Sequence, residues 1–232
     1  MNKHICVLFC YNNYDHIKSC FESLYDDNID FFIIENHSIN SELISEFFLE
    51  QKLKGYIQFE KNITNKAVSI FIKEYLETLK QYEYITISDC DLTVLNSKDT
   101  FDEIKKNLEL EDVAVCCADL DMCNLPNIPN NEHWVPTPRI ITDEYIDGDS
   151  GVHLMTIKKE NLNLLQVENF IDFELRARTF SINKKWVRTL KSKAYHLTWD
   201  LYFTGNEYFE YKNAKYHELW SHNRTCEYKI LK

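Results

Sequence analysis

Apolar and polar positions follow a regular strand–helix order over the first 95 residues. Four short apolar runs predict buried strands, at residues 4–9, 31–34, 56–59 and 84–88. Apolar residues with helical spacing lie between these runs and predict helices, at residues 15–24, 41–53 and 66–80. Successive strand–helix units form right-handed crossovers. We therefore expect an α/β fold, a three-layer α/β/α sandwich around a mostly parallel central sheet.

The pattern changes after residue 95. All four prolines fall within residues 124–139, where no periodicity is visible, so this stretch predicts a long loop. Helical or strand-like patterns lie on either side of it, at residues 101–108, 152–157, 170–179 and 186–189. A chain of 232 residues can bury a sizeable core, and its length suits one domain spanning residues 1–232.

The net charge of −11 is unevenly distributed. Residues 1–174 carry a charge of −18 and residues 175–232 carry +7. Such an acidic protein is a poor candidate for nucleic-acid binding, which depends on cationic side chains. An anionic ligand would have to meet the basic C-terminal part or be bridged by a metal. The stretch Arg176–Lys193 has seven Lys or Arg residues and no acid, so we expect it to add positive potential beside such a ligand.

Eight cysteines are present without a C-x-x-C motif, which predicts buried, reduced thiols in a cytoplasmic protein. No apolar segment has the length of a signal peptide or a transmembrane helix. Peripheral association with a membrane stays open, and the oligomeric state is not predicted.

The sharpest local feature is the pair Asp89 and Asp91, which follows the predicted strand at residues 84–88. Ligands of open α/β sheets bind at the carboxyl ends of the strands. Two carboxylates at this edge attract a hard divalent cation such as Mg²⁺ or Mn²⁺. An ordinary solvated turn would favour the same two residues, so the spacing alone leaves both interpretations open.

The order of elements, ending in Asp-x-Asp near residue 90, resembles the GT-A glycosyltransferases, especially the inverting, family 2-like enzymes. Six short segments carry this resemblance, namely Phe9-Cys10-Tyr11-Asn12, Ile34-Glu35-Asn36-His37-Ser38, Glu60-Lys61-Asn62, Asp89-Cys90-Asp91, the stretch Asp147–Glu160 with its central glycines, and Ile171–Arg178. Glu35 replaces the family's Asp, while His37 and Thr64 stand where glycines are usual. His196 follows the last predicted strand, where the family often has a histidine that binds the metal.

This resemblance implies a metal-dependent glycosyltransferase of the hexosyltransferase type. The enzyme would pass a sugar from a nucleoside-diphosphate sugar, most often a UDP-sugar, to a hydroxyl group of a glycan, glycolipid, glycoprotein or other acceptor. Residues 1–95 would form the donor-binding half, and residues 96–232, with the Pro-rich loop 124–139, the acceptor-binding half. The donor contacts implied are Cys10, Tyr11, Asn12, Glu35, Asn62, Asn65, Asp89, Cys90 and Asp91.

The remaining implied residues act on the metal, the acceptor or the proton. Mn²⁺ or Mg²⁺ would be held by Asp89, Asp91 and His196. The acceptor contacts implied are His133, Trp134, Asp149, Ser150 and Gly151. Asp172 is implied as the base that deprotonates the acceptor hydroxyl, with Glu174 as the second candidate. A charge at a helix N-terminus would also explain Asp172, and core packing would also explain His196.

Two other functions stay open. The segment Ile85–Thr93 also resembles the first motif of the haloacid-dehalogenase phosphatases, Mg²⁺-dependent enzymes with an aspartate nucleophile. That motif normally opens its domain, whereas three strand–helix units precede it here. The second alternative is a catalytically degenerate GT-A module that binds without turnover.

Overall fold

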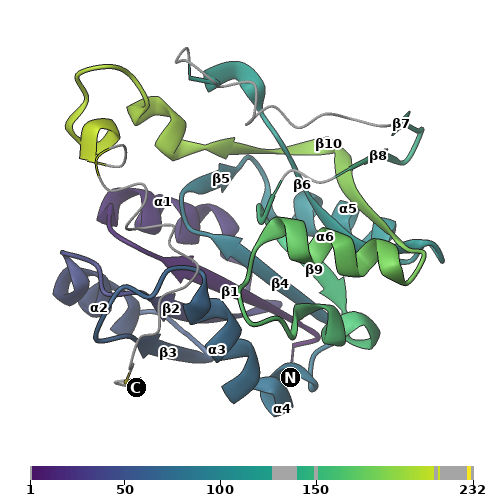
Figure 1. The fold of residues 1–232 in the computed structure, drawn as a ribbon, viewed down its shortest axis with the longest axis horizontal. Helices are drawn as coiled ribbons and strands as arrows, with labels where there is room; N and C mark the ends of the chain where they lie inside the picture. Colours follow the sequence, from purple (N-terminus) through teal and green to yellow (C-terminus); the bar gives the residue numbers. More distant parts are fainter. Residues whose placement is uncertain (1, 127–139, 149–150, 212–213, 215–228, 231–232) are drawn as a thin grey trace.

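A computed structural model describes residues 2–126, 140–148, 151–211, 214 and 229–230 (Figure 1). Its strands are β1 (His4–Cys10), β2 (Ile29–Glu35), β3 (Gly55–Gln58), β4 (Tyr84–Asp89), β5 (Leu92–Val94), β6 (Val113–Leu120), β7 (Ile140–Ile141), β8 (Tyr145–Asp147), β9 (Met155–Lys158) and β10 (Lys185–His196). Its α-helices are α1 (Tyr14–Leu24), α2 (Ser41–Leu49), α3 (Lys66–Glu74), α4 (Leu76–Leu79), α5 (Ser97–Leu108) and α6 (Asp172–Ser181). Short 3₁₀ helices are η1 (Met122–Asn124), η3 (Lys159–Leu165) and η4 (Leu197–Leu201).

All ten strands belong to one sheet with the order β3-β2-β1-β4-β9-β6-β10-β8-β7, and β5 pairs with β10. From β3 to β10, β9 alone runs opposite to the other strands. The prediction of a mostly parallel central sheet is therefore confirmed. Its physical basis is the strand–helix alternation of the first 95 residues, where each helix returns the chain to the same end of the sheet.

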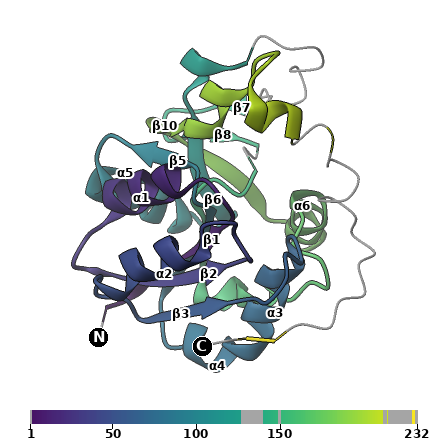
Figure 2. The same ribbon diagram turned by 90° about the vertical axis from the view of Figure 1, so that its left-hand side faces the viewer.

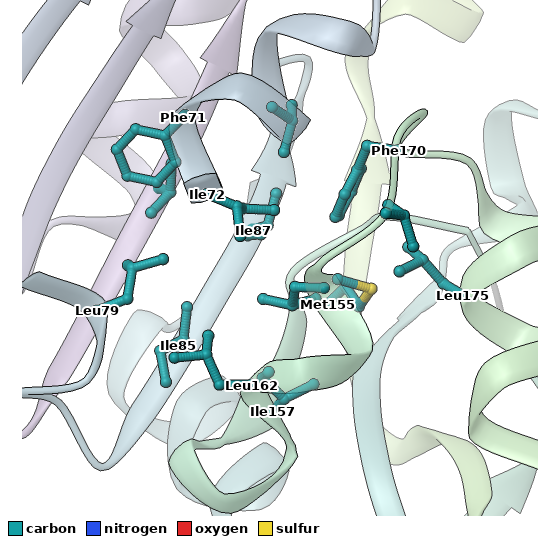
Figure 3. Close-up of a cluster of buried hydrophobic side chains, with 14 of the residues drawn as sticks. Phe71, Ile72, Leu79, Ile85, Ile87, Met155, Ile157, Leu162, Phe170 and Leu175 are labelled. Carbon is teal, nitrogen blue, oxygen red and sulfur yellow. The ribbon is translucent and has the colours of Figure 1, made fainter. Parts of the chain in front are cut away.

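Strand β1 contributes side chains to the cores on both faces of the sheet, because successive side chains of a strand point in opposite directions. Ile5 and Val7 pack into one core with α3, α4 and α6. Cys6 and Leu8 pack into a second core with α1, α2 and α5. Figure 2 shows these two groups of helices on opposite faces of the sheet, and Figure 3 shows part of the first core. Burying one such aliphatic side chain contributes roughly 1.5–3 kcal/mol to the free energy of unfolding. The two cores therefore hold β1 firmly within the sheet.

The structure differs from the predicted elements at several places, including the following four. The helix expected at 66–80 divides at Tyr75, whose ring stacks on Phe71 at a centroid distance of 5.0 Å. Strand β6 was not expected, although all eight of its residues are buried. Strand β9 begins at Met155 instead of residue 152, because Leu154 has a φ of 53° that interrupts an extended chain. Strand β10 continues to His196, where it pairs with β5.

The predicted burial of the cysteines is confirmed for most of those that the structure describes. Their seven cysteines are free thiols, and six of them are buried, with Cys123 exposed. Within the described parts of the chain, no helix has the length and apolar composition needed to cross a membrane.

Candidate active site

Strands β1, β2 and β4 end at one edge of the sheet, and a cavity of about 250 Å³ opens there. Helices α1 and α3 begin at the same edge, and residues of their first turns lie in the cavity wall. Unpaired N–H groups at a helix N-terminus favour anions. The described wall consists of Phe9, Tyr11, Asn12, Asn13, His16, Ile17, Asn36, Asn62, Thr64, Asn65, Val68, Ile87, Asp89, Cys90, Asp91, Val152, His153, Phe170, Asp172, Thr198, Tyr208 and Tyr211.

One end of the cavity is built from asparagine side chains. The side-chain amide of Asn36 donates to Oδ1 of Asn62 at 2.8 Å, and Asn36 Oδ1 accepts from the backbone N–H of Ile63 at 3.1 Å. Asn12 Oδ1 accepts from the backbone N–H of Ile39 at 2.9 Å. These bonds tie the turns after β1, β2 and β3 together. They leave a neutral surface that has both donors and acceptors.

The other end of the cavity carries carboxylates and imidazoles, and His196 lies beside it, outside the described wall. Asp91 lies in the turn between β4 and β5, and β5 pairs with β10 so that His196 lies opposite Leu92. This pairing brings His196 Nδ1 to 3.8 Å from Oδ2 of Asp91. Thr198 donates its hydroxyl to the same carboxylate oxygen at 2.5 Å.

The His196 ring is held between two other rings. It stacks on Trp199 at a centroid distance of 4.8 Å and an interplanar angle of 2°. His153 meets it edge-on at a centroid distance of 5.2 Å. The ring is therefore fixed in orientation beside Asp91, which a metal ligand requires.

Asp172 lines the cavity from α6, which lies on the face of the sheet opposite to α1. It is the first residue of α6 and lies in the cavity wall. Gly151 is close to it, because a Cβ atom on Gly151 would lie 3.2 Å from Oδ2 of Asp172 and 3.2 Å from Cε1 of His153. Gly151 also has a φ of +81°, which glycine adopts without strain. The glycine therefore lets the carboxylate and the imidazole approach the same point.

The structure brings many of the implied residues together and leaves others elsewhere. Tyr11, Asn12, Asn62, Asn65, Asp89, Cys90, Asp91 and Asp172 line the cavity. Cys10 and Glu35 are fully buried outside its described wall. Glu35 accepts from the backbone N–H of Ser38 at 2.5 Å, and burial raises the pKa of its carboxyl. Asn36 occupies the wall at this turn.

Other implied residues have different positions. Glu174 lies outside the described wall and pairs with Arg178 at 3.2 Å. The implied acceptor contacts His133, Trp134, Asp149 and Ser150 lie outside the described residues.

None of the seven cations of the basic stretch Arg176–Lys193 lines the described wall, so its contribution to the potential at the cavity stays a prediction. Several of them pair with acids elsewhere, as Arg188 does with Asp119 at 2.6 Å. Side chains of β10 point alternately to the two faces of the sheet, so cations that are neighbours in the sequence do not lie on one surface.

The wall residues that the sequence did not single out include His16, His153 and Thr198. His16 belongs to the first turn of α1, and no motif distinguishes it from a surface histidine. Thr198 follows His196 by two residues, so its place beside Asp91 depends on the β5–β10 pairing.

No family model matches the chain. Two relatives from Acanthamoeba polyphaga mimivirus are "Uncharacterized protein L142", 31% identical over 97% of this chain and 50% of the relative, and "Uncharacterized protein L137", 30% identical over 99% and 34%. The chain thus spans half or less of the length of these relatives.

Solved structures resemble the chain at low sequence identity. The mannosyltransferase PcManGT from Pyrobaculum calidifontis, in complex with GDP-Man and Mn²⁺, has a TM-score of 0.58 and 12% identity, over 92% of this chain and 61% of that one. TarS residues 1–349 from S. aureus has a TM-score of 0.53 and 14% identity, over 96% and 73%. A protein from Desulfovibrio desulfuricans G20, provisionally assigned as a nucleotide-diphospho-sugar transferase, has a TM-score of 0.51 and 6% identity, over 94% and 99%.

The chain has the GT-A fold. This confirms the predicted fold class. In this GT-A chain the Asp-x-Asp strand is the fourth strand, whereas the phosphatase alternative needs it at the start of the domain.

The side chains at the acidic end of the cavity can be compared with the ligands that divalent cations prefer. Asp91 and His196 provide one carboxylate and one imidazole with facing atoms 3.8 Å apart. Among the described residues, no group of three or more His, Cys, Asp or Glu side chains is arranged around one point. Mg²⁺-type sites are commonly built from one or two protein ligands and completed by substrate phosphates and water. The residues present therefore fit a divalent cation that takes its other ligands from water or from a bound molecule.

Proposed function

We propose that this chain is a metal-dependent glycosyltransferase, of the inverting and family 2-like kind, that transfers a sugar from a nucleoside-diphosphate sugar to an acceptor hydroxyl. The observation that carries the proposal is one cavity at the carboxyl ends of β1, β2 and β4 that combines a neutral amide end with Asp89, Asp91 and Asp172. Residues 1–95 and 96–232 act as the donor and acceptor halves of a single domain. UDP is the first nucleotide to test, and GDP is the second, because PcManGT was solved with GDP-Man.

The nucleoside would lie on the amide end of the cavity. Asn36 and Asn62 present amide groups that are already oriented by each other and by the backbone of Ile63. Asn12, Asn65 and Tyr11 complete this side of the wall. Orientation before binding lowers the entropy cost of recognition.

Asp91 and His196 would hold Mn²⁺ or Mg²⁺, with Asp89 beside them, and the cation supplies charge neutralisation for the leaving diphosphate. The hydrogen bond from Thr198 and the stacking on Trp199 fix these two ligands. This contribution replaces the lysines and arginines that the described wall does not contain.

Asp172 would accept the proton of the acceptor hydroxyl. In an inverting displacement, the acceptor hydroxyl attacks the anomeric carbon from the side opposite to the departing diphosphate. The base must therefore lie on the other side of the sugar from the metal that binds the diphosphate. Asp172 and Asp91 line one cavity, Asp172 as the first residue of α6 and Asp91 in the turn after β4. Gly151 leaves room for the carboxylate, and the acceptor would enter beside it.

A thermal-shift screen tests the proposal. The chain is heated with UDP-sugars and GDP-sugars, each with and without Mn²⁺. A true donor binds only the folded state and therefore raises Tm. At a hundredfold excess over Kd, it adds about 2.7 kcal/mol to the free energy of unfolding. We expect a rise that requires Mn²⁺. No shift with any nucleotide sugar would contradict the proposal.

Turnover separates the enzyme from a degenerate binding module. With the stabilising donor and no acceptor, we expect slow Mn²⁺-dependent release of free sugar, because water replaces the acceptor hydroxyl. Binding without such hydrolysis, and without transfer to any glycan acceptor, would favour the module.

A further inference from the structure

The described wall of the cavity contains three carboxylates and no lysine or arginine. A diphosphate bound there needs hydrogen-bond donors in addition to a cation. Two histidines lie in the wall, His16 in α1 and His153 two residues before β9. Of these, His16 has a hydrogen-bond arrangement that defines its chemistry.

His16 lies in the first turn of α1 and is half-buried. Its Nδ1 is 2.9 Å from the side-chain amide nitrogen of Asn13. An amide nitrogen can only donate, so Nδ1 must accept. The proton of the neutral ring is therefore on Nε2, because the partner of one ring nitrogen sets the tautomer of the other.

The environment keeps this ring neutral. Burial lowers the pKa of His16, and the negative fields of Asp91, Asp200 and Asp15 oppose this shift without reversing it. The same field shows that His16 is electrostatically coupled to Asp91, the residue at which the diphosphate is expected.

We propose that His16 donates a hydrogen bond from Nε2–H to a phosphate oxygen of the nucleotide donor. The inference rests on the proposed function and adds a donor-contacting residue to it. A neutral imidazole suits a cavity that already holds a metal, because it binds the anion without repelling the cation. Asn13 acts through His16 as a positioning residue.

Isothermal titration of the full chain with Mg²⁺ and UDP, and separately with Mg²⁺ and GDP, tests this contact. His16→Leu removes the donor, and we expect the affinity for the nucleotide that binds to fall about tenfold to a hundredfold. His16→Gln keeps an N–H at similar reach, so it should stay within about threefold of the original chain. Ser19→Leu is the matched control, because it places the same side chain at an exposed position of α1.

Nuclear magnetic resonance gives a second test that needs no variant. Two-bond nitrogen–proton correlations of the His16 ring should show the Nε2–H tautomer in the free protein, and the Nε2 shift should move upon addition of Mg²⁺ and UDP or GDP. An Nδ1–H tautomer, an unmoved shift at saturation, or equal affinity of His16→Leu and the original chain would overturn the inference. If the original chain binds neither nucleotide, the proposed function itself fails.

Discussion

The two ends of the cavity use different chemistry for different tasks. At the amide end, Asn36 and Asn62 are linked to each other and to the backbone, and they carry no charge. At the acidic end, Asp91 and His196 are 3.8 Å apart and are held by Thr198 and Trp199. The amide end suits a polar but neutral group such as a nucleobase or ribose. The acidic end repels phosphate until a cation is present.

This difference has a consequence for binding. Nucleotide affinity should depend steeply on the metal, whereas affinity for a nucleoside without phosphates should not. The chain as a whole is also acidic, with a net charge of −11. The described wall contains no lysine or arginine that could neutralise a bound phosphate. Variants at the two ends should therefore separate metal dependence from nucleoside recognition.

Asp91→Ala should have the largest effect. It removes the carboxylate that faces His196 and accepts from Thr198. We expect Mn²⁺-dependent donor turnover to fall about 10³-fold, since metal neutralisation is worth several kcal/mol in the transition state. Mn²⁺ titration followed by electron paramagnetic resonance should show the matching loss of bound metal. Asp102→Ala is the control, because Asp102 pairs with Lys98 on the exposed face of α5. Equal loss in both variants would contradict the assignment.

Asp172→Asn should abolish transfer while sparing donor binding. Loss of a general base typically costs about 10²–10⁴-fold in rate. We expect kcat for transfer to fall by at least a hundredfold, with an unchanged Mn²⁺-dependent Tm shift by the donor. Glu174→Gln tests the second candidate, and it should keep most activity because Glu174 pairs with Arg178 outside the described wall. Near-normal transfer by Asp172→Asn would show that the base is another group.

Gly151→Ala should reduce transfer about tenfold. The new Cβ would lie 3.2 Å from Oδ2 of Asp172 and 3.2 Å from His153, at a φ of +81° that alanine rarely adopts. The carboxylate must move by a few tenths of an ångström, and such displacements weaken catalysis more than binding. Steady-state kinetics should show a lower kcat with little change in the donor KM. Gly205→Ala is the control, since its φ is +90° but nothing lies within 4 Å of the added atom.

Asn36→Ala should weaken the donor at the neutral end without changing the metal. Asn36 is 1% exposed and holds both Asn62 and the backbone of Ile63. Without these bonds Asn62 is no longer held in place, and loss of a ligand hydrogen bond there costs about 1–2 kcal/mol, or roughly tenfold in Kd. Calorimetry should show weaker binding of the nucleotide and unchanged Mn²⁺ affinity. A loss of Mn²⁺ affinity instead would show that the two ends are not separable.

The first half of the fold was predictable because its signals are local. Each strand from β1 to β4 is rich in apolar, β-branched or aromatic residues, and each helix between them has helical apolar spacing, so the carboxyl edge and Asp89 and Asp91 could be placed together. Strand β6 was missed, although all eight of its residues are buried, because Cys116, Cys117 and Asp119 weakened its β-branched pattern.

The site was less predictable where distant segments meet. His196 reaches Asp91 through the pairing of β10 with β5, and three β5 residues give too short a run to recognise. Glu35 is a residue whose side-chain orientation could not be read from its position in the sequence. Its position in the sequence suggests a ligand contact, but its side chain folds back to the N–H of Ser38 and leaves Asn36 in the wall.

Glu35→Gln should have the smallest effect, and its pH dependence has a definite sign. Burial raises the pKa of Glu35 above that of an exposed glutamate. The contribution of Glu35 to stability is therefore complete below the ordinary carboxyl pKa, about 4.3, and is lost as the pH rises through the raised value in the folded state. Glutamine keeps an acceptor for the Ser38 N–H and avoids the buried charge.

Thermal unfolding of Glu35→Gln should therefore match the original chain near pH 4 and exceed it near pH 7. We expect a gain in Tm of no more than about 2–4 °C, the shift that 1 kcal/mol produces in a chain of this size. Glu46→Gln, an exposed position of α2, should show no such trend. A Tm that is lower at pH 7 than that of the original chain would mean that the charged form of Glu35 is needed in the folded state. The turn after β2 would then belong with the charged end of the cavity, and nucleoside recognition at Asn36 would itself depend on a carboxylate.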